Sequence, residues 1–105
     1  ENRYFYSNLA MQELHDIAFD TAFIAASGID ENGAYLLDQG DAEIVGLAVS
    51  RARKVILVAE HQKFVNKSYY RICPLDKISM FITDKALTPE QRAMFTDKTE
   101  IIVAN

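Results

Sequence analysis

The sequence predicts an α/β fold, a three-layer Rossmann-like sandwich with a largely parallel sheet. Two apolar runs, residues 21–26 and 54–59, are continuous rather than alternating, which is typical of strands covered on both faces. Stretches with helical periodicity separate these and further short strands, as expected for a parallel sheet. With 105 residues, half of them apolar and a quarter charged, the chain fits one domain or part of one.

The first elements follow in order from the amino terminus. Residues 3–6 are short, aromatic and strand-like. A helix capped by Ser7 or Asn8 is expected to run to about Ile17, because apolar residues there form one stripe. After the strand at residues 21–26, residues 27–33 are predicted to be a loop with glycines near both ends.

The middle of the chain contains the second helix and the strongest strand. Residues 41–53 are predicted to form a helix, with acidic residues near its start and basic residues near its end, an order that complements the helix dipole. The strand at residues 54–59 follows, and residues 60–68 are predicted to be a polar loop. Residues 69–75 are ambiguous, because Pro74 is compatible with either an edge strand or a loop.

The last elements are shorter. Residues 78–83 are predicted to form a strand. Thr88 is expected to cap a helix ending near Phe95, because Pro89 at the first helical position and Gln91 at the third complete a capping box. Residues 101–103 are predicted to be a final strand.

Two polar loops, residues 27–33 and 60–67, follow buried strands and therefore lie where ligands bind in parallel sheets. Asp30 can accept hydrogen bonds from sugar hydroxyls, although an ordinary turn explains the same residues. Lys63 suits a phosphate or another anionic oxygen, although a solvated loop lysine is the alternative. The charged neighbours of His61 favour a solvated side chain over a base, and Phe64 favours a loop held by packing.

Composition and motifs exclude several classes of function. Eleven basic against fifteen acidic residues give a net charge of −4, a poor basis for binding a nucleic-acid backbone. The single cysteine, Cys73, excludes an internal disulfide and a cysteine metal cluster, and it is expected to be a small core residue. No metal-ligand spacing, nucleotide loop or catalytic triad is recognisable, so no metal and no cofactor are expected. No apolar run approaches the roughly 18 residues that span a bilayer.

Residues 19–64 together with Ile82-Thr83-Asp84 resemble the C-terminal effector domain of DeoR-type bacterial transcriptional repressors. The matching features are the strand at residues 20–24, Gly28-Ile29-Asp30, the Ala42-Glu43 helix start, and the strand that precedes Lys63-Phe64. Each motif is weak alone, but their order and spacing together are specific. The resemblance covers nearly the whole chain.

The resemblance implies a sensor for a phosphorylated sugar, with a fold similar to that of ribose-5-phosphate isomerase. It implies ligand-binding roles for Ser27, Gly28, Asp30 and Lys63. Val45 lies near the position expected for the catalytic Glu of the isomerase, and Glu43 is two residues away, so no catalytic residue is assigned. A binding domain without enzyme activity is therefore expected, and an active sugar-phosphate isomerase is the alternative.

The resemblance also implies that residues 1–105 are the second half of the sensor, an incomplete sandwich without the first half or the helix-turn-helix domain. Operator DNA would then be bound only through an absent N-terminal domain, in a cytoplasmic protein with no membrane partner. A homo-oligomer is expected, and a third alternative is that this half mainly carries the oligomer contact.

Overall fold

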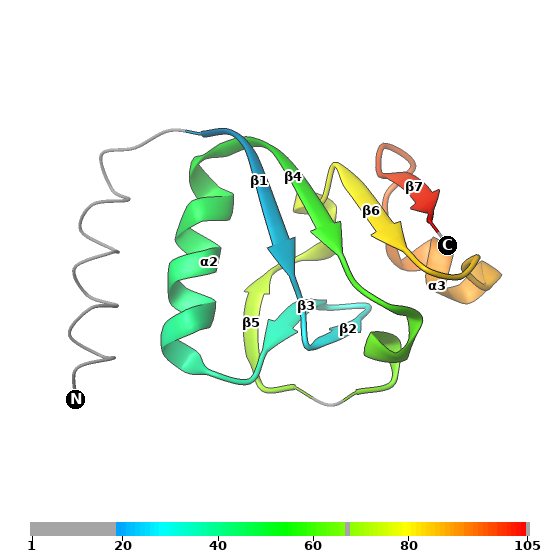
Figure 1. Ribbon diagram of the computed structural model, residues 1–105, viewed down its shortest axis with the longest axis horizontal. Coiled ribbons are helices and arrows are strands. Elements are labelled where there is room, and N and C mark those ends of the chain that lie inside the picture. Colours follow the sequence, from blue (N-terminus) through cyan, green and yellow to red (C-terminus); the bar gives the residue numbers. More distant parts are fainter. Residues whose placement is uncertain (1–18, 67, 105) are drawn as a thin grey trace.

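The main element of the fold is a four-stranded parallel sheet, in agreement with the predicted class (Figure 1). The computed structural model describes residues 19–66 and 68–104. The strand order is β1-β4-β6-β7, and all three neighbouring pairs run parallel. The strands are β1 (Phe19–Ala25), β4 (Ala52–Val58), β6 (Met80–Thr83) and β7 (Glu100–Val103).

A second sheet of three antiparallel strands is formed by β2 (Gly28–Asp30), β3 (Gly33–Leu36) and β5 (Tyr70–Cys73). The prediction of a loop at residues 27–33 was wrong, because β2 and the start of β3 form a hairpin there. A two-residue turn, Glu31-Asn32, joins these strands and leads into Gly33, whose φ of 154° is rare for other residues. Of the two alternatives for residues 69–75, the structure has an edge strand, which ends before Pro74.

Helix α2 (Gln39–Arg51) connects the two sheets in the chain and packs mainly against β5 and β1. It begins two residues earlier than predicted, because Asp38 is its N-cap and accepts a hydrogen bond from the Asp41 N–H at 2.8 Å. The helix also ends two residues earlier than predicted, at Arg51, and β4 starts at the next residue.

The shorter helices lie in the connections that follow β4, β5 and β6. The 3₁₀ helices are η1 (His61–Phe64) and η2 (Leu75–Lys77). Helix α3 (Pro89–Met94) confirms the predicted capping box, since the side chain of Thr88 accepts from the Gln91 N–H and that of Gln91 accepts from the Thr88 N–H.

One face of the parallel sheet carries the core. The register aligns Ile24 with Leu57 and Leu57 with Phe81, so these buried side chains share a face. Phe81 is fully buried; its ring stacks on Phe95 and meets Phe64 edge-on, with centroid distances of 5.1 and 5.8 Å. The core therefore joins the centre of the sheet to η1 and to the end of α3.

The opposite face of the same sheet is partly open. The register places Phe23 beside Ile56 on this face; Ile56 is buried, but Phe23 is 71% exposed, and Val58 is 44% exposed. The prediction that β1 is covered on both faces was therefore wrong for the residues that the structure describes. The predicted strand at residues 3–6 and the helix ending near Ile17 lie outside the described residues.

Candidate functional site

The carboxyl ends of the parallel strands lie along one edge of the main sheet, here called the carboxyl edge (Figure 1). Three segments leave the strands at this edge: Ser27 with β2 follows β1, η1 follows β4, and Asp84 follows β6. Because parallel strands end together, segments far apart in sequence are collected at one place. This edge contains all four residues predicted to bind a ligand.

The β2–β3 hairpin fixes the first of these segments. The Ser27 N–H donates to the Tyr35 carbonyl at 2.8 Å, and the Asp30 carboxylate accepts from the Asn32 N–H at 2.8 Å, which stabilises the turn. The Tyr35 hydroxyl donates to Asp30, and the pKa of Tyr35 is raised mainly by burial and then by this carboxylate. Asp30 thus has the ordinary turn role, and a carboxylate has further lone pairs for another donor.

Gly28 permits a close approach between this hairpin and the segment after η1. A Cβ at Gly28 would lie 2.9 Å from both the Asn66 carbonyl oxygen and the Ser68 Cβ. These distances are too short for any other residue without movement of the neighbouring backbone. The glycine therefore has a packing role that brings β2 and the η1 connection together.

The second segment, η1, is held against β6 by two contacts. Asp84 accepts a hydrogen bond from the His61 N–H at 2.7 Å, and its other carboxylate oxygen lies 3.0 Å from His61 Nδ1. Phe64 packs on Phe81, which confirms the expectation of a loop held by packing. The interpretation of His61 as a solvated side chain was wrong, because its imidazole is paired with the Asp84 carboxylate.

Lys63 lies between these two anchors and is half-buried. Its backbone N–H donates to the Glu60 carbonyl at 3.0 Å, which closes the turn of η1. Among residues 19–66 and 68–104, no carboxylate forms an ion pair with the Lys63 ammonium. A cation on a fixed backbone with no internal counter-charge is suited to an anionic ligand.

A cavity of about 370 Å³ lies beside these groups, between the β2–β3 hairpin and the chain that follows η1. This volume is in the range of small-molecule sites. Asp30 lines the cavity and Lys63 does not, although the two residues that follow Lys63 do. The Ser68 hydroxyl oxygen is buried and has no partner among the described residues. The lining residues are Ile29, Asp30, Tyr35, Phe64, Val65, Asn66, Ser68 and Tyr69.

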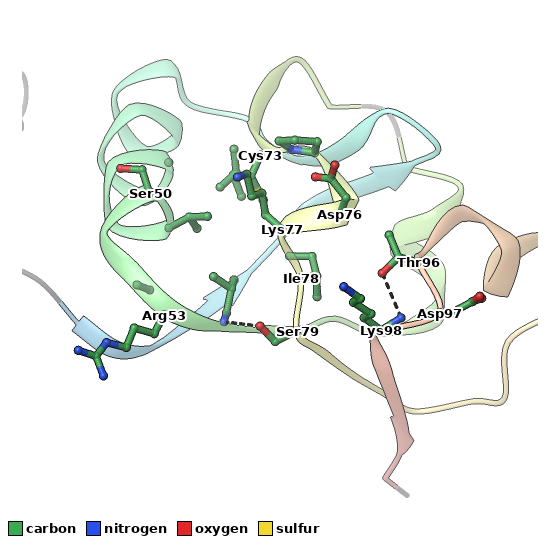
Figure 2. Close-up of a pocket in the computed structure, with 16 residues that line it drawn as sticks. Ser50, Arg53, Cys73, Asp76, Lys77, Ile78, Ser79, Thr96, Asp97 and Lys98 are labelled. Carbon is green, nitrogen blue, oxygen red and sulfur yellow. Dashed lines mark hydrogen bonds between the residues drawn. The ribbon is translucent and has the colours of Figure 1, made fainter.

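A larger cavity, about 970 Å³, lies at the opposite edge of the sheet, here called the amino edge (Figure 2). Figure 2 shows charged side chains of both signs on its rim, including Arg53, Lys77, Lys98, Asp76 and Asp97. None of the four predicted ligand-binding residues lines it. Sequence reasoning gave no indication of this cavity, because its residues come from several connections with no shared motif.

Cys73 borders the amino-edge cavity but is buried, as predicted for a small core residue. Burial raises the pKa of its thiol to about 11, so the nucleophilic thiolate is scarce at neutral pH. Within the part of the chain that the structure describes, no group of three or more His, Cys, Asp or Glu residues could hold a metal ion.

Asp84 is a carboxyl-edge residue that sequence reasoning did not assign to the site. The signal that could have found it is its position directly after β6, which is equivalent to the positions of the two loops that follow β1 and β4. The aspartate was noted only as part of a motif, because a sequence does not show that β4 and β6 are neighbours.

Comparison with known proteins decides the family. The model of the DeoR C-terminal sensor domain matches residues 1–85. The chain belongs to this family. The predicted resemblance is therefore confirmed, and the domain is of a kind that serves effector sensing in transcriptional regulation.

Curated relatives carry names of transcriptional regulators. The HTH-type transcriptional repressor GlcR of Bacillus subtilis is 29% identical over 85 residues, which are 81% of this chain and 33% of GlcR. The HTH-type transcriptional regulator GlpR of Haloferax volcanii is 33% identical over 75 residues, which are 70% of this chain and 29% of GlpR. A regulator of Haemophilus influenzae is 27% identical over 96 residues, covering 91% of this chain and 38% of the relative. The chain thus spans about a third of the length of these relatives.

Within residues 19–66 and 68–104, none of the helices combines the length and the apolarity needed to cross a lipid bilayer.

Proposed function

We propose that this chain is the effector-binding part of a bacterial transcriptional repressor, and that its ligand is a phosphorylated sugar bound at the carboxyl edge. Ligand binding would alter the affinity for operator DNA of a helix-turn-helix domain elsewhere in the full-length protein. The names of the relatives and the match to the sensor family support this assignment.

The observation that carries the proposal is that Lys63 directly precedes two residues, Phe64 and Val65, that line the same cavity as Asp30. Among the described residues Lys63 has no carboxylate partner, and as a cation on a fixed turn it suits the phosphoryl oxygens. Asp30 is an acceptor that suits sugar hydroxyls, and the exposed Tyr69 offers an aromatic face beside it. Ser27 and Gly28 belong to the same site, where backbone groups at the start of β2 can complete the ligand contacts.

A binding role without catalysis is favoured because sugar isomerisation needs a carboxylate base that can exchange protons with two carbons. Asp30 is committed to its turn, and Val45 lies on α2 where the isomerase fold would need Glu. One observation favours the alternative of an active isomerase: an imidazole oriented by a carboxylate, as in the His61–Asp84 pair, is an arrangement that general bases use.

Calorimetry on the full-length protein tests the ligand class. A panel of sugar phosphates, the matching free sugars and inorganic phosphate should give binding only when a phosphoryl group is present, and the tightest binding when the sugar is also present. The same compounds in a coupled isomerase assay separate the two functions. Turnover of any panel member would contradict the proposed sensor function and favour the alternative of an active isomerase.

A homo-oligomer is also proposed for the full-length protein. Support comes from the open sheet face with exposed Phe23 and Val58, and from the free edge of β1 in the sheet that the structure describes. Light scattering on the full-length protein tests this, and a single monomeric species at micromolar concentration would contradict it.

A further inference from the structure

The Asp84 carboxylate makes two contacts with one residue of η1. One contact uses the backbone, since Asp84 Oδ1 accepts from the His61 N–H at 2.7 Å. The other uses the side chain, since Asp84 Oδ2 lies 3.0 Å from His61 Nδ1. A carboxylate only accepts hydrogen bonds, so the proton of a neutral His61 must be on Nδ1 and its Nε2 is left as an acceptor.

The geometry of a 3₁₀ helix makes this contact directional. Residues three apart lie on the same side of such a helix, so His61 and Phe64 both face β6. Phe64 contacts the Phe81 ring in the interior, and His61 contacts Asp84 at the strand end. Lys63 lies on a different side of η1, and its orientation is therefore set by contacts that other residues make.

We propose that Asp84 is a positioning residue for anion binding, which acts through His61 to fix η1 so that Lys63 presents its ammonium at the carboxyl edge. The inference rests on the proposed function, because it names the residues that prepare the same site. It assigns a role to His61 and Asp84 that is neither catalytic nor a direct ligand contact.

The electrostatics favour this indirect role over direct contact of Asp84 with the ligand. A free carboxylate would repel a phosphoryl group, but the charge of Asp84 is engaged by the His61 N–H and imidazole. Its pKa is lowered first by the backbone N–H of His61, so it stays ionised and keeps both contacts at neutral pH. The ligand class is a compound with a dianionic phosphoryl group, for which inorganic phosphate is the simplest probe.

The test uses Asp84→Asn in the full-length protein, with inorganic phosphate and glucose 6-phosphate as probes. Asn keeps the size of the side chain but removes the charge and one acceptor. We expect about tenfold weaker binding, the size expected when one charge-assisted hydrogen bond loses its alignment, with a melting temperature close to that of the wild type. Asp97→Asn, which removes an exposed carboxylate at the amino edge, is the matched control and should leave affinity unchanged.

A second measurement needs no ligand. In ¹⁵N-detected NMR spectra, the His61 imidazole of the wild type should show the proton on Nδ1, and the His61 amide should be protected from hydrogen exchange. Asp84→Asn should change the imidazole signal and reduce the protection. His61→Ala removes the imidazole but keeps the backbone contact, so it should weaken phosphate binding less than Asp84→Asn does.

The two measurements separate the possible failures. If the wild type binds neither probe but the NMR signature is present, the proposed function fails and the positioning of η1 by Asp84 stands. If both probes bind the wild type and Asp84→Asn with equal affinity, or if the His61 signals are the same in both proteins, the positioning role is overturned.

Discussion

The two edges of the parallel sheet differ in how their charged groups are held. At the carboxyl edge the cavity is small, about 370 Å³, but the neighbouring segments are fixed by a hairpin, by the Asp84–His61 pair and by the packing of Phe64. At the amino edge the cavity is larger, about 970 Å³, and both exposed cations and exposed carboxylates line it (Figure 2).

Cavity size alone does not identify the proposed ligand site in this fold. Among the described residues, neither Lys63 nor the amino-edge cations Lys77 and Lys98 form an ion pair with a carboxylate. Lys63 differs in that its turn is held from both sides, by the Asp84 contact and by the packing of Phe64. A cation on a fixed backbone, rather than cavity volume, therefore favours the carboxyl edge as the proposed ligand site.

The largest expected effect is the loss of Phe81, whose ring connects the sheet to the carboxyl edge. Phe81→Ala should destabilise the domain by about 3–5 kcal/mol, because the ring is fully buried and contacts both Phe64 and Phe95. Urea unfolding of the full-length protein measures this. Val58→Ala, on the open face of the same sheet, is the control and should cost far less. Equal losses would contradict the assignment of the core to one face.

The fold class was predictable because local signals and topology agree in this sequence. Continuous apolar runs predicted β1 and β4, and the capping box predicted α3 to within one residue. The hairpin at β2 and β3 was missed because glycine, aspartate and asparagine indicate turns, and three-residue strands are too short to show alternation. The pattern did not reveal that the turn was only two residues long.

The site was predictable only in part, for a similar reason. Asp30 and Lys63 were predicted to lie at the carboxyl edge, where the structure has them, because each lies on a connection that follows a strongly apolar strand. Their role in ligand binding stays a prediction. The pairing of His61 with Asp84 depends on β4 and β6 being neighbours, although the two residues are 23 positions apart in sequence and β5 and η2 lie between them. No local pattern carries that information, so a histidine among polar residues was interpreted as solvated.

The next prediction compares the two edges directly. Lys63→Ala in the full-length protein should weaken the binding of a sugar phosphate by roughly ten- to a hundredfold, about 1.5–3 kcal/mol, through the loss of one charge-assisted hydrogen bond. Lys98→Ala, which removes an exposed cation from the amino edge, should leave the affinity unchanged. Calorimetry at one salt concentration measures both. The reverse order of effects would move the ligand site to the amino edge.

Two threonine hydroxyls that accept hydrogen bonds from nearby backbone N–H groups extend the comparison to stability. Thr88→Ala should destabilise the domain by about 1 kcal/mol, because it removes the hydrogen bond from the Gln91 N–H to the Thr88 hydroxyl, one of the two in the α3 capping box. Thr96→Ala, on the amino-edge cavity, should cost less, since its hydroxyl accepts from the Lys98 N–H only at 3.3 Å. Thermal melts of the two variants measure the difference. A greater loss for Thr96→Ala would show that the amino edge is the more tightly held of the two.

The smallest expected effect is the contribution of Asp84 to stability in acid. The His61 backbone N–H, and then its imidazole, lower the pKa of Asp84 in the folded chain below its ordinary value. The stabilisation is therefore present at pH values above the ordinary pKa, and it is lost as the pH falls through the lowered one. Asp84→Asn should flatten the decline in stability below about pH 4, measured as urea midpoints between pH 3 and 6. The change should be small, because the side chain is 37% exposed and solvent screens the interaction.

Asp97→Asn at the amino edge controls for the loss of one negative charge. Parallel curves for the wild type and Asp84→Asn would mean that the contact with His61 is not retained in solution, and the carboxyl edge would then lose the polar half of what distinguishes it from the amino edge.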